Sequence, residues 1–258
     1  MAIKYLKKAI KKPETDDVKT RAAVQSILDD IEKRKEEAIK ELNKKFDKYE
    51  GEIIVSKEKI EEAVKKVDQK TKDDVQFAYE RVRKFAEHQL KSMNNNFEVE
   101  LSKGLFAGQR LIPVETAGCY IPGGRYAHIS SAVMAITPAK VAGVEKIICA
   151  SPPKGNDGAN AGIIYAANLC GANTIMNLGG VAAIGALTHG LFGNPPVDFL
   201  VGAGNQYVAE AKRIVYGKVG IDQFAGPTEI AIIADKSADK ELVAADIVGQ
   251  AEHGYNSP

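Results

Sequence analysis

The segment Ala117-Gly-Cys-Tyr-Ile-Pro-Gly-Gly124 decides the fold, because a short apolar strand runs directly into a proline–glycine turn and then into a helical stretch. The same order of strand, turn and helix recurs three times, with strands predicted at 146–150, 174–176 and 197–201. Four such units in succession predict a parallel sheet with helices on its faces. The fold class is therefore α/β.

The chain before this region, up to about Lys103, is dense in Lys and Glu and predicts an amino-terminal helical segment. Pro13-Glu-Thr15 is predicted to open the first helix, and Ser56 and Thr71 to cap two later ones. Ile53-Ile-Val55 is predicted to form a short strand. Further on, alternating apolar residues predict two strands joined at Lys103-Gly104.

The region after Asp222 combines a turn, an apolar run and a helix pattern. Ile230-Ala-Ile-Ile-Ala234 is predicted to be a buried strand. Asp239 is predicted to cap a helix. The inner face of that helix is formed by Leu242, Val243, Ile247 and Val248.

Gln250 and His253 lie three residues apart near the end of this helix, so both side chains emerge on one face. An amide oxygen beside an imidazole could be part of a metal site, although Gln is an uncommon zinc ligand. Alternatively, His253 caps the helix or interacts with its dipole. Glu252 could also act as a general base.

The composition is that of a soluble globular protein, with 258 residues, 45% hydrophobic and 27% charged residues and a net charge of +1. This charge gives no reason to expect nucleic acid or a membrane as partner. The amino terminus lacks a signal-peptide pattern, and no apolar run has membrane-spanning length. Cys119, Cys149 and Cys170 lack Cys-x-x-Cys spacing and are predicted to be buried free thiols in a reducing, cytoplasmic setting.

Glycine turns at successive strand ends are the candidate ligand sites, namely Pro122-Gly-Gly124, Gly179-Gly180 and Gly202-Ala-Gly-Asn205. None completes Gly-x-Gly-x-x-Gly, since the sixth position after Gly202 is Tyr207, and no phosphate loop ending in Gly-Lys-Ser/Thr is present. A nucleotide or phosphate ligand and purely structural turns both remain open on these patterns. A Ser-His-Asp arrangement is not apparent either, and Cys119 has no identified base.

Several ordered motifs resemble the histidinol dehydrogenase family. They are Gly118-Cys-Tyr-Ile-Pro-Gly-Gly124, Gly202-Ala-Gly-Asn205, Glu210-Ala-Lys-Arg213, Ile221-Asp222, Ala225-Gly-Pro-Thr-Glu229 and Gln250-Ala-Glu-His-Gly254. Gly124-Arg-Tyr-Ala-His128 and Gly254-Tyr-Asn-Ser-Pro258 resemble the sulfopropanediol 3-dehydrogenase branch more than the histidine-biosynthetic one.

The resemblance implies NAD- and zinc-dependent oxidation of a primary alcohol through the aldehyde to a carboxylate. It implies that Tyr120 and Asn205 contact NAD and that Thr228 contacts the substrate. It also implies that Gln250 and His253 bind Zn2+ and, through it, the substrate. Two departures concern the cofactor: Ala182 stands where a Gln is usual, and Ala203 replaces a Pro. The lost hydrogen bond would weaken NAD binding by on the order of 1 kcal/mol.

The branch resemblance favours 2,3-dihydroxypropane-1-sulfonate, oxidised to sulfolactate, as the alcohol. Arg125 and His128 are further candidates for substrate contact, since a sulfonate binds guanidinium or imidazolium donors. Arg125 could instead face solvent or cofactor phosphates, and His128 could cap the following helix. The alternatives are an L-histidinol dehydrogenase and, in another class, a non-catalytic nucleotide-binding or scaffold fragment.

The resemblance further implies two Rossmann-like parallel-sheet domains and a homodimer with shared active sites. The first domain would comprise 1–119 plus 228–258, and the inserted second domain 120–227. Family members continue beyond Pro258, where the catalytic Glu-His pair and the other zinc ligands are expected. No catalytic residue is therefore assigned in this chain, and the 258-residue chain alone is predicted to be inactive.

Overall fold

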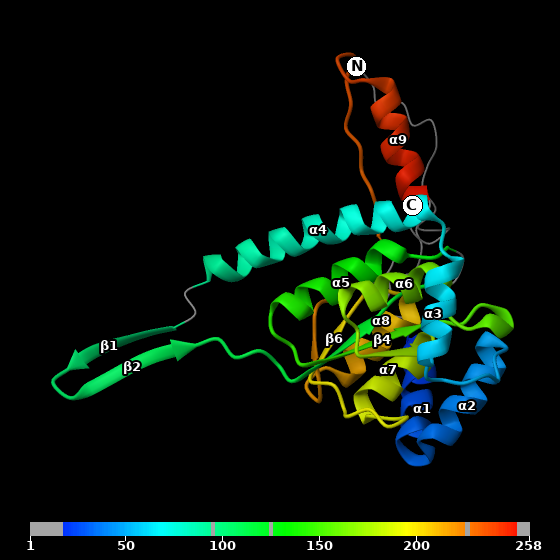
Figure 1. Ribbon diagram of the computed structural model, residues 1–258, viewed down its shortest axis with the longest axis horizontal. Coiled ribbons are helices and arrows are strands. Elements are labelled where there is room, and N and C mark those ends of the chain that lie inside the picture. Colours follow the sequence, from blue (N-terminus) through cyan, green and yellow to red (C-terminus); the bar gives the residue numbers. More distant parts are fainter. Residues whose placement is uncertain (1–17, 94–95, 124–125, 225–227, 252–258) are drawn as a thin grey trace.

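A five-stranded parallel sheet forms the centre of the computed structural model, which describes residues 18–93, 96–123, 126–224 and 228–251 (Figure 1). Its strands lie in the order β5-β4-β3-β6-β7. They are β3 (Thr116–Tyr120), β4 (Lys146–Ser151), β5 (Thr174–Asn177), β6 (Phe199–Val201) and β7 (Gly220–Ile221). The predicted α/β fold is thus confirmed, and the two-residue strand β7 adds an edge that the sequence patterns did not predict.

The strand order creates a switch point between β3 and β6. From β3 the chain builds outward through β4 to β5, and then crosses back to place β6 on the other side of β3. In open parallel sheets, ligands bind at the carboxyl ends of the two strands that flank such a point. Here those ends are Tyr120 and Val201.

Helices cover both faces of the sheet (Figure 1). One core contains Ile148 and Ala150 of β4, and the opposite core contains their neighbours Ile147 and Cys149. This alternation explains why the strands read as continuous apolar runs, since each side chain is buried on one face or the other. The first face is covered by α1 (Val18–Arg34), α2 (Glu36–Leu42), α7 (Gly180–His189) and α8 (Gln206–Val215). The second is covered by α3 (Lys57–Lys66), α4 (Gln69–Ser92), α5 (Ile129–Val141) and α6 (Ala161–Cys170).

The amino-terminal helical segment is confirmed, with one helix start corrected. Ser56 caps α3 as predicted, because its hydroxyl accepts a hydrogen bond from the Lys59 amide at 3.3 Å. The prediction that Thr71 caps α4 is wrong. Asp68 caps this helix, and its carboxylate accepts the Thr71 amide at 2.9 Å. The predicted start at Pro13-Glu-Thr15 lies outside the described residues.

Short extended segments flank the sheet. Ile54 of the predicted strand 53–55 forms an isolated antiparallel bridge with Met176, so this segment pairs with β5 without forming a full strand. The predicted strand pair is confirmed as an antiparallel hairpin of β1 (Asn96–Ser102) and β2 (Leu105–Arg110). The hairpin projects away from the sheet, and all its residues are exposed (Figure 1).

The predicted buried strand at 230–234 is wrong. These residues form no strand, and Ile233 is fully exposed. The run pairs with no strand among the described residues, so its apolar composition alone does not make it a strand. The helix after it, α9 (Lys240–Ala251), is confirmed with Asp239 as its cap. Its expected inner face is not packed, because Leu242, Ile247 and Val248 are all exposed.

Other expectations concern the whole chain. The three cysteines are buried and free, as predicted. In the part of the chain that the structure describes, no helix combines the length and apolarity that a membrane span requires. The helices α1 to α4 pack against elements of 120–227. The division at residues 119/120 and 227/228 stays a prediction.

Candidate functional site

Tyr120 ends the central strand β3 and lies on the side of the sheet covered by α7 and α8. Its side chain is buried, and its hydroxyl oxygen accepts a hydrogen bond from the backbone N–H of Gly180 at 3.3 Å. Burial raises the pKa of Tyr120 to about 12, so the phenol keeps its proton at neutral pH. Within the described ranges this O–H has no acceptor, so it could donate to a ligand at the carboxyl edge.

Gly202 begins the turn after β6 and lies directly against Tyr120. It has φ of +125°, and a Cβ at this position would lie 2.1 Å from the Tyr120 carbonyl oxygen. Only glycine fits this approach. The ends of β3 and β6 are thus pressed together at the switch point.

An ion pair between the buried Lys212 and the partly exposed Asp222 holds this turn. Asp222 Oδ2 accepts a hydrogen bond from the Gly202 N–H at 2.8 Å, and Lys212 Nζ donates to the Gly202 carbonyl oxygen at 2.8 Å. Lys212 Nζ also donates to Asp222 Oδ1. Both backbone groups of Gly202 are therefore bound by one charged pair, and the Lys212 side chain is 1% exposed.

Lys212 and Asp222 lie in motifs of the family resemblance, but the sequence patterns give neither residue a role. The sequence does contain a sign that Lys212 is buried, because this residue shares the apolar face of α8 with Val208, Ala211 and Val215. A lysine among core positions needs a buried partner. The partner itself could not be identified, because it lies on another element.

Asn205 caps α8 at the end of the same turn. Its side-chain oxygen accepts the amides of Tyr207 at 3.0 Å and Val208 at 3.1 Å. This use of the oxygen leaves the exposed amide nitrogen as a donor with no partner in the described part of the chain. Tyr120 and Asn205, the two predicted NAD contacts, therefore flank the same switch point.

The turn at Gly179-Gly180 opens α7 next to Tyr120. No side chain caps this helix, and Gly180 has φ of +56° with open space where a Cβ would stand. Helix amino termini with free amides favour anionic groups. Ala182 lies buried in the first turn of α7, where its methyl group offers no hydrogen bond.

The remaining predicted site residues lie elsewhere. Gln250 Nε2 donates to the carbonyl oxygen of Thr228 at 2.9 Å and to its hydroxyl at 3.1 Å, so these two residues are brought together. His128 stands half-buried at the start of α5 without a side-chain capping bond. Arg125 and His253 lie outside the described residues. Within 18–93, 96–123, 126–224 and 228–251, no cluster of three or more His, Cys, Asp and Glu could hold a metal.

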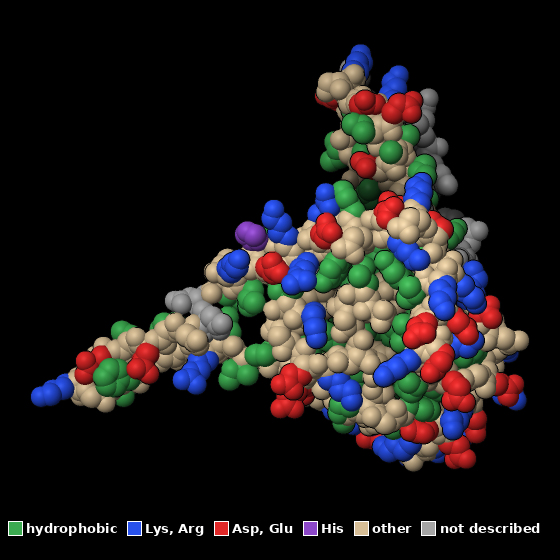
Figure 2. All heavy atoms as spheres, viewed as in Figure 1, with side chains coloured by type: hydrophobic (Ala, Val, Ile, Leu, Met, Phe, Trp, Pro, Cys, Tyr) green, Lys and Arg blue, Asp and Glu red, His purple; other side chains and the backbone are tan. Residues whose placement is uncertain are grey.

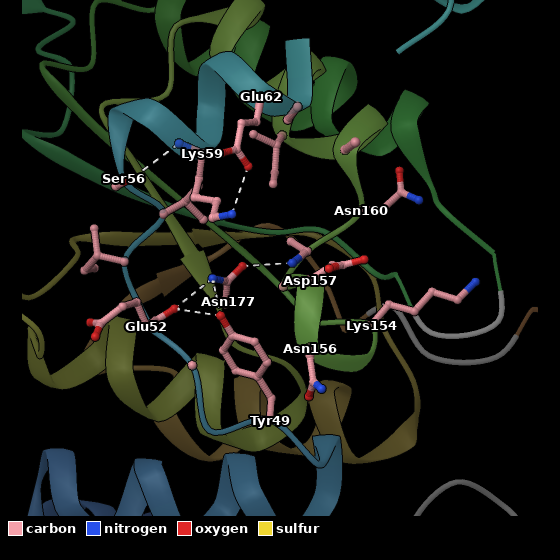
Figure 3. A pocket seen from close by; sticks show the side chains of 18 of the residues that line it. Tyr49, Glu52, Ser56, Lys59, Glu62, Lys154, Asn156, Asp157, Asn160 and Asn177 are labelled. Carbon is pink, nitrogen blue, oxygen red and sulfur yellow. Dashed lines mark hydrogen bonds and ion pairs between the residues drawn. The ribbon is translucent and has the colours of Figure 1, made fainter. Parts of the chain in front are cut away.

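A cavity lies beyond the carboxyl ends of β4 and β5 (Figure 3). This cavity of about 520 Å³ lies between α3 and the loop before α6. Asn177 lines it and is fully engaged, since its oxygen accepts the Ala159 amide and its nitrogen donates to Tyr49 and the Glu52 carbonyl. Asn177 thus connects three segments of the chain, and no sequence pattern marks it.

Charges of both signs are interspersed over the face of the molecule shown in Figure 2. Lys and Arg side chains alternate with Asp and Glu across the amino-terminal helices, and several form exposed pairs such as Arg34 with Asp30 and Glu41. Mixed charge of this kind is typical of a solvated helical layer.

Several known proteins are similar to this chain. The family model described as histidinol dehydrogenase matches residues 10–258. A histidinol dehydrogenase homolog of Pelagibacter ubique is 69% identical over the whole chain, which covers 60% of that protein. The sulfopropanediol 3-dehydrogenase of Ruegeria pomeroyi is 50% identical over the whole chain, which covers 59% of it.

The fold comparison points the same way. The crystal structure of histidinol dehydrogenase from Elizabethkingia anophelis matches with a TM-score of 0.85 and 36% identity, over 96% of this chain and 56% of that one. The chain thus spans about three fifths of the length of the relatives it matches. The chain belongs to the histidinol dehydrogenase family.

Proposed function

We propose that this chain is part of an NAD- and zinc-dependent oxidoreductase that converts a primary alcohol through the aldehyde to a carboxylate. The observation that carries the proposal is the convergence of Tyr120 and Asn205 on the switch point of the sheet, with a turn between them held by Lys212 and Asp222. A family-model match from residue 10 to residue 258 supports it.

The residues at the switch point fit a dinucleotide. Gly180 offers open space beside an uncapped helix amino terminus, and Gly202 brings two strand ends together. The Tyr120 hydroxyl and the Asn205 amide would each donate one hydrogen bond to the cofactor. NAD would supply the hydride acceptor, and the protein residues would bind and orient it. Ala182 adds no hydrogen bond of its own, so we expect modest affinity.

The zinc part of the proposal rests on fewer residues. Of its two predicted ligands only Gln250 is described, and its amide nitrogen is engaged by Thr228. A catalytic zinc site generally uses three protein ligands. We therefore propose zinc for the full-length protein and derive no step of the reaction through it.

For the substrate we propose 2,3-dihydroxypropane-1-sulfonate, with sulfolactate as product. The support is the 50% identity, over the whole chain, with a protein named sulfopropanediol 3-dehydrogenase. Thr228 would contact the alcohol, and Arg125 and His128 are the proposed donors to the sulfonate. The second candidate is L-histidinol, favoured by the fold match to a histidinol dehydrogenase.

We also propose a homodimer with active sites completed across subunits, and a first domain of 1–119 plus 228–258 with 120–227 inserted. The proposal competes with a non-catalytic nucleotide-binding or scaffold role. An oxidoreductase and a scaffold would both bind the cofactor, but only the oxidoreductase would oxidise an alcohol.

The test compares two proteins, this 258-residue chain and a chain extended to the length of its relatives. Each is assayed for NADH formation with 2,3-dihydroxypropane-1-sulfonate and with L-histidinol. We expect the extended protein to oxidise the sulfonate and the 258-residue chain to show no turnover. Strong preference for L-histidinol would overturn the substrate proposal. Absence of turnover in the extended protein would favour the scaffold.

A further inference from the structure

Asp47 is a half-buried carboxylate without a partner. It ends the π-helical turn η1 (Asn43–Asp47), and neither hydrogen bond nor ion pair engages its side chain among the residues that the structure describes. Burial raises the pKa of Asp47. Burying a charged carboxylate costs free energy unless a hydrogen-bond donor or an opposite charge binds it.

The position of Asp47 is fixed by contacts that span most of the chain. Asn43, at the start of the same turn, donates from its side chain to the carbonyl oxygen of Asn177, the last residue of β5. A Cβ on Gly179 would lie 3.3 Å from Asp47 Oδ2 and 2.6 Å from Pro152 Cβ. Asp47 is therefore held beside the turns that follow β4 and β5.

Asp47 also borders the predicted cofactor residues. Gly179 is followed by Gly180, whose amide binds the Tyr120 hydroxyl. After burial itself, the negative charge of Asp47 contributes to the raised pKa of Tyr120. The carboxylate thus lies at the carboxyl edge of β3, β4 and β5, on the far side of Tyr120 from β6 and Asn205.

Dinucleotide-binding sheets usually place a carboxylate in this region. It stands at the end of the strand after the first glycine turn and accepts hydrogen bonds from the ribose of the adenosine half. The corresponding strand here is β4, which runs into Ser151-Pro-Pro153 and carries no acidic residue. Asp47 of the amino-terminal segment lies close to the end of this strand, since Asp47 Oδ2 and Pro152 Cβ both lie within 3.3 Å of the Cβ position on Gly179.

We propose that Asp47 binds the adenosine ribose hydroxyls of NAD and excludes NADP. This inference rests on the proposed NAD-dependent function. Each carboxylate oxygen would accept one ribose hydroxyl in a charge-assisted hydrogen bond. The 2′-phosphate of NADP would meet a like charge and lose those hydrogen bonds.

If Asp47 had only a structural role, replacing it would affect stability and not cofactor preference. The carboxylate lies near the amino terminus of α7, where a negative charge stabilises the helix dipole. In that case Asp47→Asn would lower stability and leave the discrimination between NAD and NADP unchanged.

The test titrates NAD, NADP and 2′-deoxy-NAD calorimetrically into the 258-residue chain and its variants. In Asp47→Asn we expect NAD to bind about tenfold more weakly and the preference for NAD over NADP to fall by at least about tenfold. Asp47→Glu, which keeps the charge, should still exclude NADP. Asp74→Asn, at an exposed position on α4, should bind all three as wild type does.

A second comparison changes the ligand and uses wild type and Asp47→Asn. Wild type should bind 2′-deoxy-NAD about tenfold more weakly than NAD, and Asp47→Asn should hardly distinguish the two. If wild type binds NAD but neither the variant nor the deoxy ligand changes the affinity or the NADP preference, the role of Asp47 is refuted and the proposed function stands. If wild type binds no NAD, both fail.

Discussion

Lys212 and Asp222 are the residues on which the geometry of the switch point depends. Both backbone groups of Gly202 are bonded to this pair, and Gly202 in turn touches Tyr120. Such a pair is weak evidence for stability, but removing one partner of a buried pair is costly. Its value here is that it fixes a turn whose ends carry the two predicted cofactor contacts.

Removing Asp222 and removing Lys212 should lower the free energy of unfolding by different amounts. We expect Asp222→Asn to lower the free energy of unfolding by about 3 to 5 kcal/mol, because it leaves a buried ammonium without a counter-charge. Lys212→Met should cost less, since the Asp222 side chain is 27% exposed and water can reach it. Urea unfolding of both single variants and the double variant measures this. Equal costs that add in the double variant would contradict the coupling.

The two glycines of the site should respond differently to alanine. Gly202→Ala should destabilise the protein by at least about 2 kcal/mol, because the new methyl group collides with the Tyr120 carbonyl. Gly180→Ala should cost only about 1 kcal/mol from its left-handed backbone. Its methyl group would enter the open space of the proposed cofactor site and weaken NAD binding. Thermal unfolding and NAD titration test the pair, and unchanged NAD affinity in Gly180→Ala would count against the site.

The buried thiol of Cys119 should make the stability of the protein depend on pH. Burial, with a smaller contribution from the charge of Asp222, raises the pKa of Cys119 to about 12 from its ordinary value of 9. Above pH 9 the unfolded chain loses this proton while the folded chain keeps it. Stability from this group is therefore complete below pH 9 and falls between pH 9 and 12. A Cys119→Ala variant should lose less stability over that window, and identical slopes would refute the assignment.

At the scale of elements, helices and strands could be predicted where one pattern determines the structure. The strands of the parallel sheet read as apolar runs because both faces are covered, and Asp239 and Ser56 cap helices through local hydrogen bonds. Predictions that depend on partners distant in sequence were less successful. Ile230-Ala-Ile-Ile-Ala234 has the composition of a strand, but it pairs with no strand among the described residues. The error at Thr71 is a local one, because Asp68, three residues earlier, caps α4 instead.

The same distinction explains the candidate site. The glycine turns follow from the strand ends, whereas the roles of Tyr120 and Asn205 come from the family resemblance, and the structure adds that Asn205 caps α8. Asp47 gave no local signal, because its significance comes from Gly179 and Pro152, which lie more than a hundred residues away in the chain. The pairing of Lys212 with Asp222 likewise required the fold.

The elements differ in how well they are anchored. The hairpin β1–β2 and the helix α9 contain no buried residue, whereas nearly all of α7 is buried. We expect limited trypsin digestion to cut first after Lys103, at the hairpin turn, and after Lys236 or Lys240, before or at the first residue of α9. Lys140, within α5, should survive. Early cleavage after Lys140, identified by mass spectrometry, would contradict this order.

At the scale of the whole molecule, the amino-terminal segment does more than cover one face of the sheet. Through Asn43 and its neighbours it brings a carboxylate and an aromatic ring to the edge where the glycine turns lie. The carboxyl edge of the sheet is therefore built from segments before, within and after the four strand–turn–helix units. This arrangement supports a dinucleotide site that spans β4, β3 and β6.

The central claim, that NAD binds across this switch point, is tested most directly by hydrogen–deuterium exchange of the 258-residue chain with and without NAD. We expect slower exchange with NAD in peptides that cover Tyr120 to Gly123, Gly179 to Ala183 and Gly202 to Val208, and unchanged exchange in the hairpin β1–β2. Protection confined to the cavity loop between Lys154 and Asn160, or protection nowhere, would contradict the account.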